Sequence, residues 1–219
     1  MDDAAAVTDM RDMIAVHDAF RVEFSALPAM VLAVAPGDTA RSAVVGRHAT
    51  LMLHVLHGHH GGEDALVWPV MKERAPEAAD LISTLEAQHH SMDPLLERAQ
   101  ELADVWAASA DAPTGASLAA ALEELHVVVA EHLALEESQF VPIAARYLTH
   151  DEWMAVGAHS RASLSQEDLA LALGTILSDT TPELGDLIIG SMPPEAQAGW
   201  TQFGRPMYEG YRAQLYDAA

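Results

Sequence analysis

The chain has 219 residues, enough for one substantial hydrophobic core with an appended segment. A formal net charge of -22 argues against nucleic acid and anionic membrane surfaces as partners, and the lack of Cys excludes disulfides, thiolate metal sites and thiol catalysis. The N-terminal residues show no signal-peptide pattern and no apolar run is long enough to cross a bilayer, so we expect a cytoplasmic protein.

Apolar residues recur at helical spacing, without the alternating runs that are typical of strands. This pattern predicts an all-α protein built as an antiparallel four-helix up-down bundle. We expect the first helix to end near Pro28 and the second to run from about Thr39 to Val70. Pro76 opens the third helix, and the loop at 111–115 precedes the fourth.

The pattern becomes less regular after Tyr147, where we predict short helices at 149–158, 166–178, 182–190 and 194–215. We assign residues 1–148 to the bundle and 149–219 to a C-terminal helical extension. Leu and Ile are too frequent in this extension for a solvated tail, so we expect it to pack on the bundle. The extension is also a candidate surface for a homo-oligomer.

An internal repeat relates the second and fourth predicted helices. His59 is followed by Glu63, and His132 is followed by Glu136, so both pairs are four residues apart. In each copy a proline stands six residues after the Glu. Side chains four apart on a helix lie about 40° apart around its axis, so each His–Glu pair points to one side. The repeat predicts that two helix pairs present matching polar groups to the bundle interior.

Two further His residues precede these pairs. His17 lies 42 residues before His59, and His89 lies 43 before His132, with Asp93 four residues after His89. A buried imidazole or carboxylate without a partner costs several kcal/mol, at order of magnitude. A metal bound inside the bundle would relieve these costs, and nitrogen and oxygen donors in a helix bundle favour iron or manganese.

This arrangement resembles the hemerythrin-like family of HHE cation-binding domains, in a bacterial type with a C-terminal extension, over about residues 8–148. The resemblance implies an oxygen-binding centre of two iron ions with an oxo or hydroxo bridge. It implies that two Glu bridge the ions, that two His hold one ion, and that two His and an Asp hold the other. The implied ligands are His17, His59, Glu63, His89, Asp93, His132 and Glu136.

Respiratory members of this family have His where Asp93 stands, a departure that argues against reversible oxygen carriage. The resemblance therefore implies a protein that binds, senses or reacts with a small diatomic molecule or peroxide, such as dioxygen or nitric oxide. Two alternatives stay open. One is an oxidoreductase, a di-iron oxidase or peroxidase with an organic substrate, which an apolar passage from the extension to the irons would favour. The other is a regulatory binding module that responds to metal or oxidation.

Other His residues offer competing arrangements. His60 with Asp64 is an alternative register, but it breaks the match with the second copy of the repeat. His54, His57 and His60 fall on other faces of their helix, so we expect a solvated or supporting cluster there. The remaining His residues are predicted to be surface or structural: His48, His90, His126, His150 and His159.

A ferritin-like di-metal arrangement is a further alternative. It uses Glu-x-x-His on two helices and a lone Glu on each of the others. The chain contains this motif at Glu86 with His89 and at Glu123 with His126. These motifs fall on adjacent predicted helices, whereas the ferritin-like order alternates them with lone-Glu helices, so the sequence disfavours this arrangement.

Overall fold

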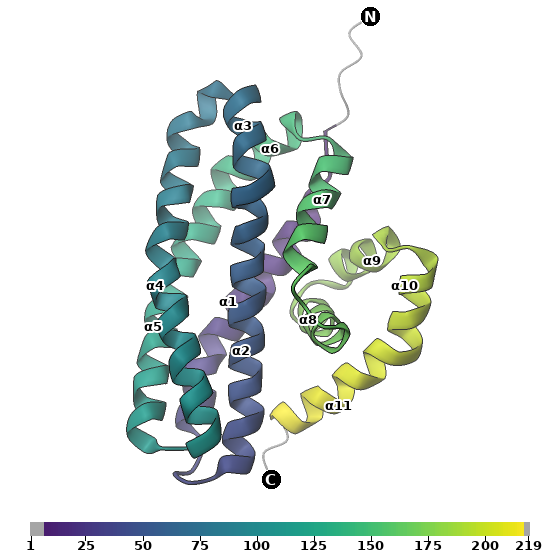
Figure 1. The fold of residues 1–219 in the computed structure, drawn as a ribbon. Helices are drawn as coiled ribbons and strands as arrows, with labels where there is room; N and C mark the ends of the chain where they lie inside the picture. Colours follow the sequence, from purple (N-terminus) through teal and green to yellow (C-terminus); the bar gives the residue numbers. More distant parts are fainter. Residues whose placement is uncertain (1–6, 217–219) are drawn as a thin grey trace, which may run out of the picture.

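Four long helices form an antiparallel bundle in a computed structural model that describes residues 7–216 (Figure 1). They are α1 (Arg11–Leu32), α2 (Thr39–Gly62), α4 (Ala79–Ser109) and α5 (Ala112–Leu135). Helix α1 packs against α2 and α5, and α4 packs against the same two helices, so the four close into a ring. The predicted all-α up-down bundle is confirmed.

The second and fourth segments of the bundle continue beyond α2 and α5 through π-helical turns. These continuations are η1 (Glu63–Val67) with α3 (Trp68–Arg74), and η3 (Glu136–Phe140) with α6 (Val141–Tyr147). A short 3₁₀ turn, η2 (Pro76–Ala78), then leads into α4. The sequence repeat is therefore also a repeat of local structure.

The first helix is longer than predicted. It continues through Pro28 to Leu32, so the expected end near Pro28 is wrong. A proline inside a helix costs about 3 kcal/mol through its missing N–H and its steric clash. Leu27 and Val31 are fully or almost fully buried on either side of it, and burial of such a side chain contributes about 1.5–3 kcal/mol. Packing on both sides thus offsets the local cost.

Two apolar clusters fill the bundle interior, one on either side of its middle. One is built around Phe20, Phe24, Leu56 and Trp106, and the other around Met13, Trp68 and Phe140. His17 lies on α1 between Met13 of one cluster and Phe20 of the other. The polar residues of the predicted site are therefore enclosed by apolar side chains at both ends.

The chain after α6 forms helices that pack along one side of the bundle (Figure 1). They are α7 (His150–Arg161), α8 (Gln166–Asp179), α9 (Pro182–Ser191), α10 (Pro194–Gly199), η4 (Trp200–Gly204) and α11 (Arg205–Tyr216). Helix α7 packs on α2, and α8 packs on α1 and α2. The predicted short C-terminal helices are confirmed.

Two glycines of α2 bring α7 close. A Cβ on Gly58 would lie 2.7 Å from the carbonyl oxygen of Ser160, and one on Gly62 would lie 2.5 Å from the Ser160 hydroxyl. Side chains at these positions would force the helices apart, so the glycines set the distance between the bundle and the extension.

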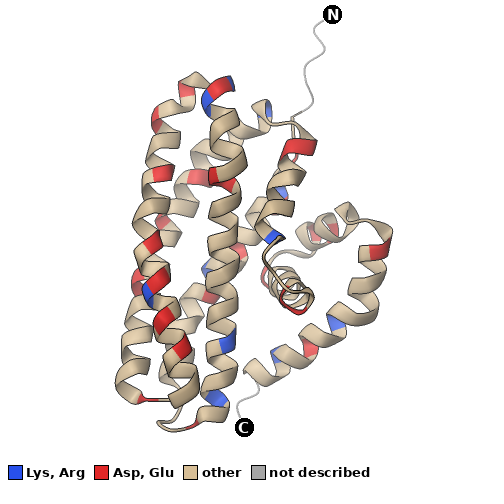
Figure 2. Cartoon of the chain, in the orientation of Figure 1, with Lys and Arg blue, Asp and Glu red and all other residues tan. Residues whose placement is uncertain are grey.

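Acidic residues dominate the charged surface (Figure 2). Several of the few basic side chains bind the extension: Arg47 of α2 pairs with Asp168 of α8, and Arg74 of α3 pairs with Glu152 of α7 at 2.6 Å. Among the described helices, none has the length and hydropathy needed to cross a membrane.

A buried polar network also joins the bundle to the extension. His48 of α2 contacts Glu23 of α1 through Nε2 at 2.8 Å, and contacts the Tyr211 hydroxyl of α11 through Nδ1 at 2.8 Å. The Tyr216 hydroxyl donates to Glu23 at 3.4 Å. Burial raises the pKa of Asp179 on α8 to about 7, and the charge of Glu23 adds to the rise. The Asp179 carboxyl group therefore keeps its proton below about pH 7.

This carboxyl pair predicts a pH-dependent stability. Asp179 keeps its proton to about pH 7 in the folded chain and to about pH 4 when unfolded. Unfolding therefore releases a proton between these values, and the free energy of unfolding falls as pH rises through them. Relative to that of Asp179→Asn, the free energy of unfolding of the wild type should fall by about 1–2 kcal/mol between pH 5 and pH 8, as measured by urea titrations. Asp186→Asn, at an exposed position of α9, is the control. Parallel pH profiles of wild type and Asp179→Asn would contradict the raised pKa of Asp179.

Candidate metal centre

Seven ionisable side chains meet inside the bundle between its two apolar clusters. They come from all four long segments, and every one of them is buried. The group, here called the His–Glu cluster, comprises His17, His59, His60, Glu63, His89, His132 and Glu136.

Each Glu of the cluster opens a π-helical turn, and a nearby proline explains that turn. Pro69 and Pro142 stand two residues after the turns; each lacks an N–H and crowds the carbonyl four residues before it. The N–H of the residue before each proline donates to the Glu carbonyl five residues back, which is the wider π pattern. Pro206 follows η4 in the same way. The prolines of the repeat thus give Glu63 and Glu136 equivalent backbone positions.

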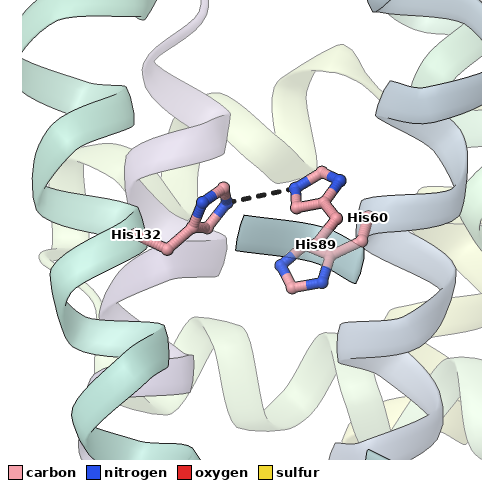
Figure 3. A group of neighbouring side chains, drawn as sticks. All are labelled: His60, His89 and His132. Carbon is pink, nitrogen blue, oxygen red and sulfur yellow. Dashed lines mark hydrogen bonds between the residues drawn. The ribbon is translucent and has the colours of Figure 1, made fainter. Parts of the chain in front are cut away.

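Imidazole nitrogens face one another in two pairs. The Nε2 atoms of His17 and His59 are 3.1 Å apart, and those of His89 and His132 are 3.2 Å apart (Figure 3). Two nitrogens bound to one cation at about 2.1 Å, with a bond angle of about 90–110°, lie about 3.0–3.4 Å apart. Each pair therefore has the spacing of two ligands on a single ion.

The two carboxylates lie between these pairs. Glu63 places Oε1 3.3 Å from Nε2 of His59 and Oε2 3.5 Å from Nε2 of His89. Glu136 places Oε2 3.6 Å from Nε2 of both His17 and His132. Each carboxylate thus touches both imidazole pairs, as a group that bridges two ions must.

Supporting acceptors fix the proton positions on three of the rings. The Nδ1–H of His89 donates to Asp64 at 2.7 Å, and that of His17 donates to Glu137 at 2.8 Å. The Nδ1–H of His132 donates to Gln88 at 3.0 Å. When both rings are neutral, the Nε2 atoms of His89 and His132 carry no proton, and their lone pairs face each other across 3.2 Å. A cation between them removes that repulsion.

The cluster also contains buried atoms without partners. Both carboxylate oxygens of Glu63, both of Glu136, and Nε2 of His60 make no hydrogen bond within the described chain. Burial raises the pKa of Glu136 to about 8, and burial with the charge of Glu136 raises that of Glu63 well above its usual value. Burial lowers the pKa of His132 to about 3. Neutral imidazoles and unpartnered carboxyls form a donor set that fits divalent cations.

The structure places Asp93 away from this cluster. Asp93 is exposed on α4 and lines a solvent-facing pocket with His57. The side of His89 that faces α2 is filled instead by the His60 ring, which stacks on His89 with ring centroids 4.2 Å apart (Figure 3). Six of the seven residues implied by the resemblance are brought together, and His60 occupies the place expected for Asp93. An exposed Asp93 gives no reason to exclude reversible oxygen carriage.

For His60 we expect a solvated or supporting position; the structure shows it buried and stacked on His89, so the solvated alternative is wrong. Helix α2 is covered by α1, α4 and α7, so residues 100° apart can both face the interior. The consecutive run of Leu51, Met52 and Leu53, all buried, is the sequence signal that α2 has more than one buried face. His48, buried against Glu23, is the structural His that the sequence allowed.

The competing arrangements do not form. Asp64 hydrogen-bonds the rings of His89 and Trp68, so it supports the cluster from outside. Of the ferritin-like residues, Glu86 pairs with Lys72 at 2.6 Å and Glu123 is exposed, so neither reaches the cluster.

Comparison with known families identifies one match. The family model described as the Hemerythrin HHE cation binding domain matches residues 7–144. That span contains the whole His–Glu cluster. Searches of curated proteins and of solved structures gave no significant match.

Proposed function

The chain belongs to the hemerythrin HHE cation-binding family, and from that premise we propose that its bundle holds two iron ions that bind or react with a small molecule. Dioxygen, peroxide and nitric oxide are the candidate molecules. The supporting observation is the set of buried imidazole nitrogens and unpartnered carboxylate oxygens that face one another.

The donor set suits two ions of iron or manganese. Imidazole and carboxylate donors from facing helices of a bundle are the ligands these metals take, and two bridging carboxylates suit a pair. Among the donors, the cluster contains groups of three whose ligand atoms all lie within 4.8 Å of one another. The proposed ligands of one ion are His17 and His59, those of the other are His60, His89 and His132, and Glu63 and Glu136 bridge the two.

The two sides of the cluster offer different numbers of protein ligands. The side with His17 and His59 has two imidazoles, whereas the side with His60 has three. An ion with fewer protein ligands has coordination positions free for an exogenous molecule. Among six side chains of the cluster, that of His59 is the most open, at 11 % exposed against 0–2 % for His17, Glu63, His89, His132 and Glu136. We therefore assign the entry of the small molecule to the His59 side.

The chain's own residues orient the ligands and exclude water. Asp64 and Glu137 hold the Nδ1 protons of His89 and His17, which keeps the Nε2 lone pairs directed into the cluster. Trp68 and Phe140 pack edge to face at 4.9 Å beside the cluster and shield it from solvent. When bound, an iron pair supplies the electrons for binding or reducing a small molecule.

Metal analysis tests the proposal. Protein purified from iron-supplemented cells should contain two irons per chain, and its absorption spectrum should change when nitric oxide or peroxide is added to the reduced form. The reason is that two bridging carboxylates serve a pair of ions and serve one ion poorly. A single metal per chain, or two irons whose spectrum is insensitive to each of these molecules, would contradict the proposal.

A second candidate is a di-iron oxidase or peroxidase that acts on an organic substrate. One observation favours it: a cavity of about 440 Å³ between the bundle and the extension is lined by His59 of the cluster.

A further inference from the structure

The cavity beside His59 has the size and lining of a small-molecule site. Its volume of about 440 Å³ falls within the roughly 300–1,000 Å³ of typical ligand pockets. Helices α1 and α2 form the bundle side, and α7 to α10 form the extension side. Most of the lining is apolar, including Val16, Val55, Trp153, Leu173, Ile176 and Ile188.

The helices on the outer wall are incompletely packed. Neither α9 nor α10 contains a fully buried residue, although α9 carries Leu187 and Ile188 on a half-buried side. Ile188 lines the cavity, so this apolar side faces the cavity instead of a packed core. An apolar molecule in the cavity would take these side chains out of contact with water.

A positive charge without a partner lines the same cavity. The guanidinium of Arg161, the last residue of α7, makes no ion pair or hydrogen bond with any residue in the described part of the chain, and the residue is exposed. Its Nη1 lies 2.9 Å from the position of a Cβ on Gly157, so the missing side chain there gives the guanidinium its place. Asp12 also lines the cavity and accepts the indole N–H of Trp153 at 2.9 Å. Burial lowers the pKa of Arg161, and the charge of Asp12 opposes that shift without a direct ion pair.

We propose that this cavity binds an amphipathic monocarboxylate, such as a medium-chain fatty acid, with its carboxylate on Arg161 and its apolar body against the lining of α7 to α9. A guanidinium pairs with a carboxylate through two parallel hydrogen bonds, a geometry that an alcohol cannot reproduce. This inference deepens the second candidate function, because the ligand would lie beside His59. Binding itself needs no metal, so the site can be tested apart from the iron centre.

Calorimetric titration of the full chain, with and without metal, tests the site. Physiological salt is used, because it screens interactions between charges more than about 8 Å apart. The probes are decanoate, 1-decanol and decylamine. Decanoate should bind about 10-fold or more tightly than decanol, because a charge-assisted hydrogen bond contributes about 1.5–3 kcal/mol. Arg161→Gln should remove that advantage, whereas Arg205→Gln, at an exposed arginine of α11, should not.

A cavity-filling variant tests the apolar body. Ala196 of α10 lines the cavity, whereas Ala198 of the same helix does not, and both are exposed. Ala196→Phe should weaken decanoate and decanol alike by about 10-fold or more, and Ala198→Phe should weaken neither. Equal affinity for decanoate and decanol, preference for decylamine, or undiminished binding in Ala196→Phe would overturn the inference. If the protein contains two irons but does not bind decanoate, only this site is rejected. If it binds decanoate but contains no iron, only the iron centre is rejected.

Discussion

Glu136→Met is expected to abolish the rise in melting temperature that iron(II) gives the wild-type protein. A cation that binds only the folded state at 100 times its dissociation constant adds about 2.7 kcal/mol, or about 5–11 °C for a chain of this size. Glu136 touches both imidazole pairs, so its loss removes a ligand from both ions. Anaerobic thermal melts with and without iron(II) measure the difference.

The same variant should make the metal-free protein more stable. Both oxygens of Glu136 are buried without partners, and a buried unsatisfied polar group costs about 1–3 kcal/mol. Met has a similar shape and no such cost, so the metal-free melting temperature should rise by several degrees. Glu131→Gln, at an exposed position of the same α5, should leave both melting temperatures unchanged. A metal-dependent rise that survives in Glu136→Met would refute the bridging role.

His60→Phe is expected to lower the affinity for metal by more than the about 10–100-fold that loss of a supporting contact causes. The Nε2 of His60 is buried without a partner in the cluster, and its ring stacks on His89. Phe keeps an aromatic ring in that place and removes the nitrogen, so metal loss can be separated from loss of packing. Titration with iron(II), followed by metal analysis after gel filtration, measures the affinity and the number of ions retained.

Asp93→Ala provides the matched comparison. Asp93 is exposed on α4 outside the cluster, so this variant should retain both metals. His57→Ala, which alters the same solvent-facing pocket, should behave likewise. Full metal retention in His60→Phe together with metal loss in Asp93→Ala would restore the ligand set inferred from the sequence.

The sequence by itself determined the bundle and most of the cluster. Apolar residues at helical spacing fixed which helices form, because each needs a buried stripe. The matched spacing of His59 with Glu63 and of His132 with Glu136 depends on one helix at a time, so periodicity alone could place each pair on one side. The proline that follows each Glu produces the same π-helical turn in both copies of the repeat.

Only the tertiary structure decided between His60 and Asp93. Both lie on helices that enclose the cluster, and helical spacing allowed Asp93 to share a side with His89. The outcome depended on where α2 and α4 lie relative to each other, which brings the His60 ring onto His89 and leaves Asp93 in solvent. The wall that α7 contributes to the cavity beside His59 likewise depends on Gly58 and Gly62, which let α7 approach α2. This contact joins segments about a hundred residues apart in the chain, so no local pattern encodes it.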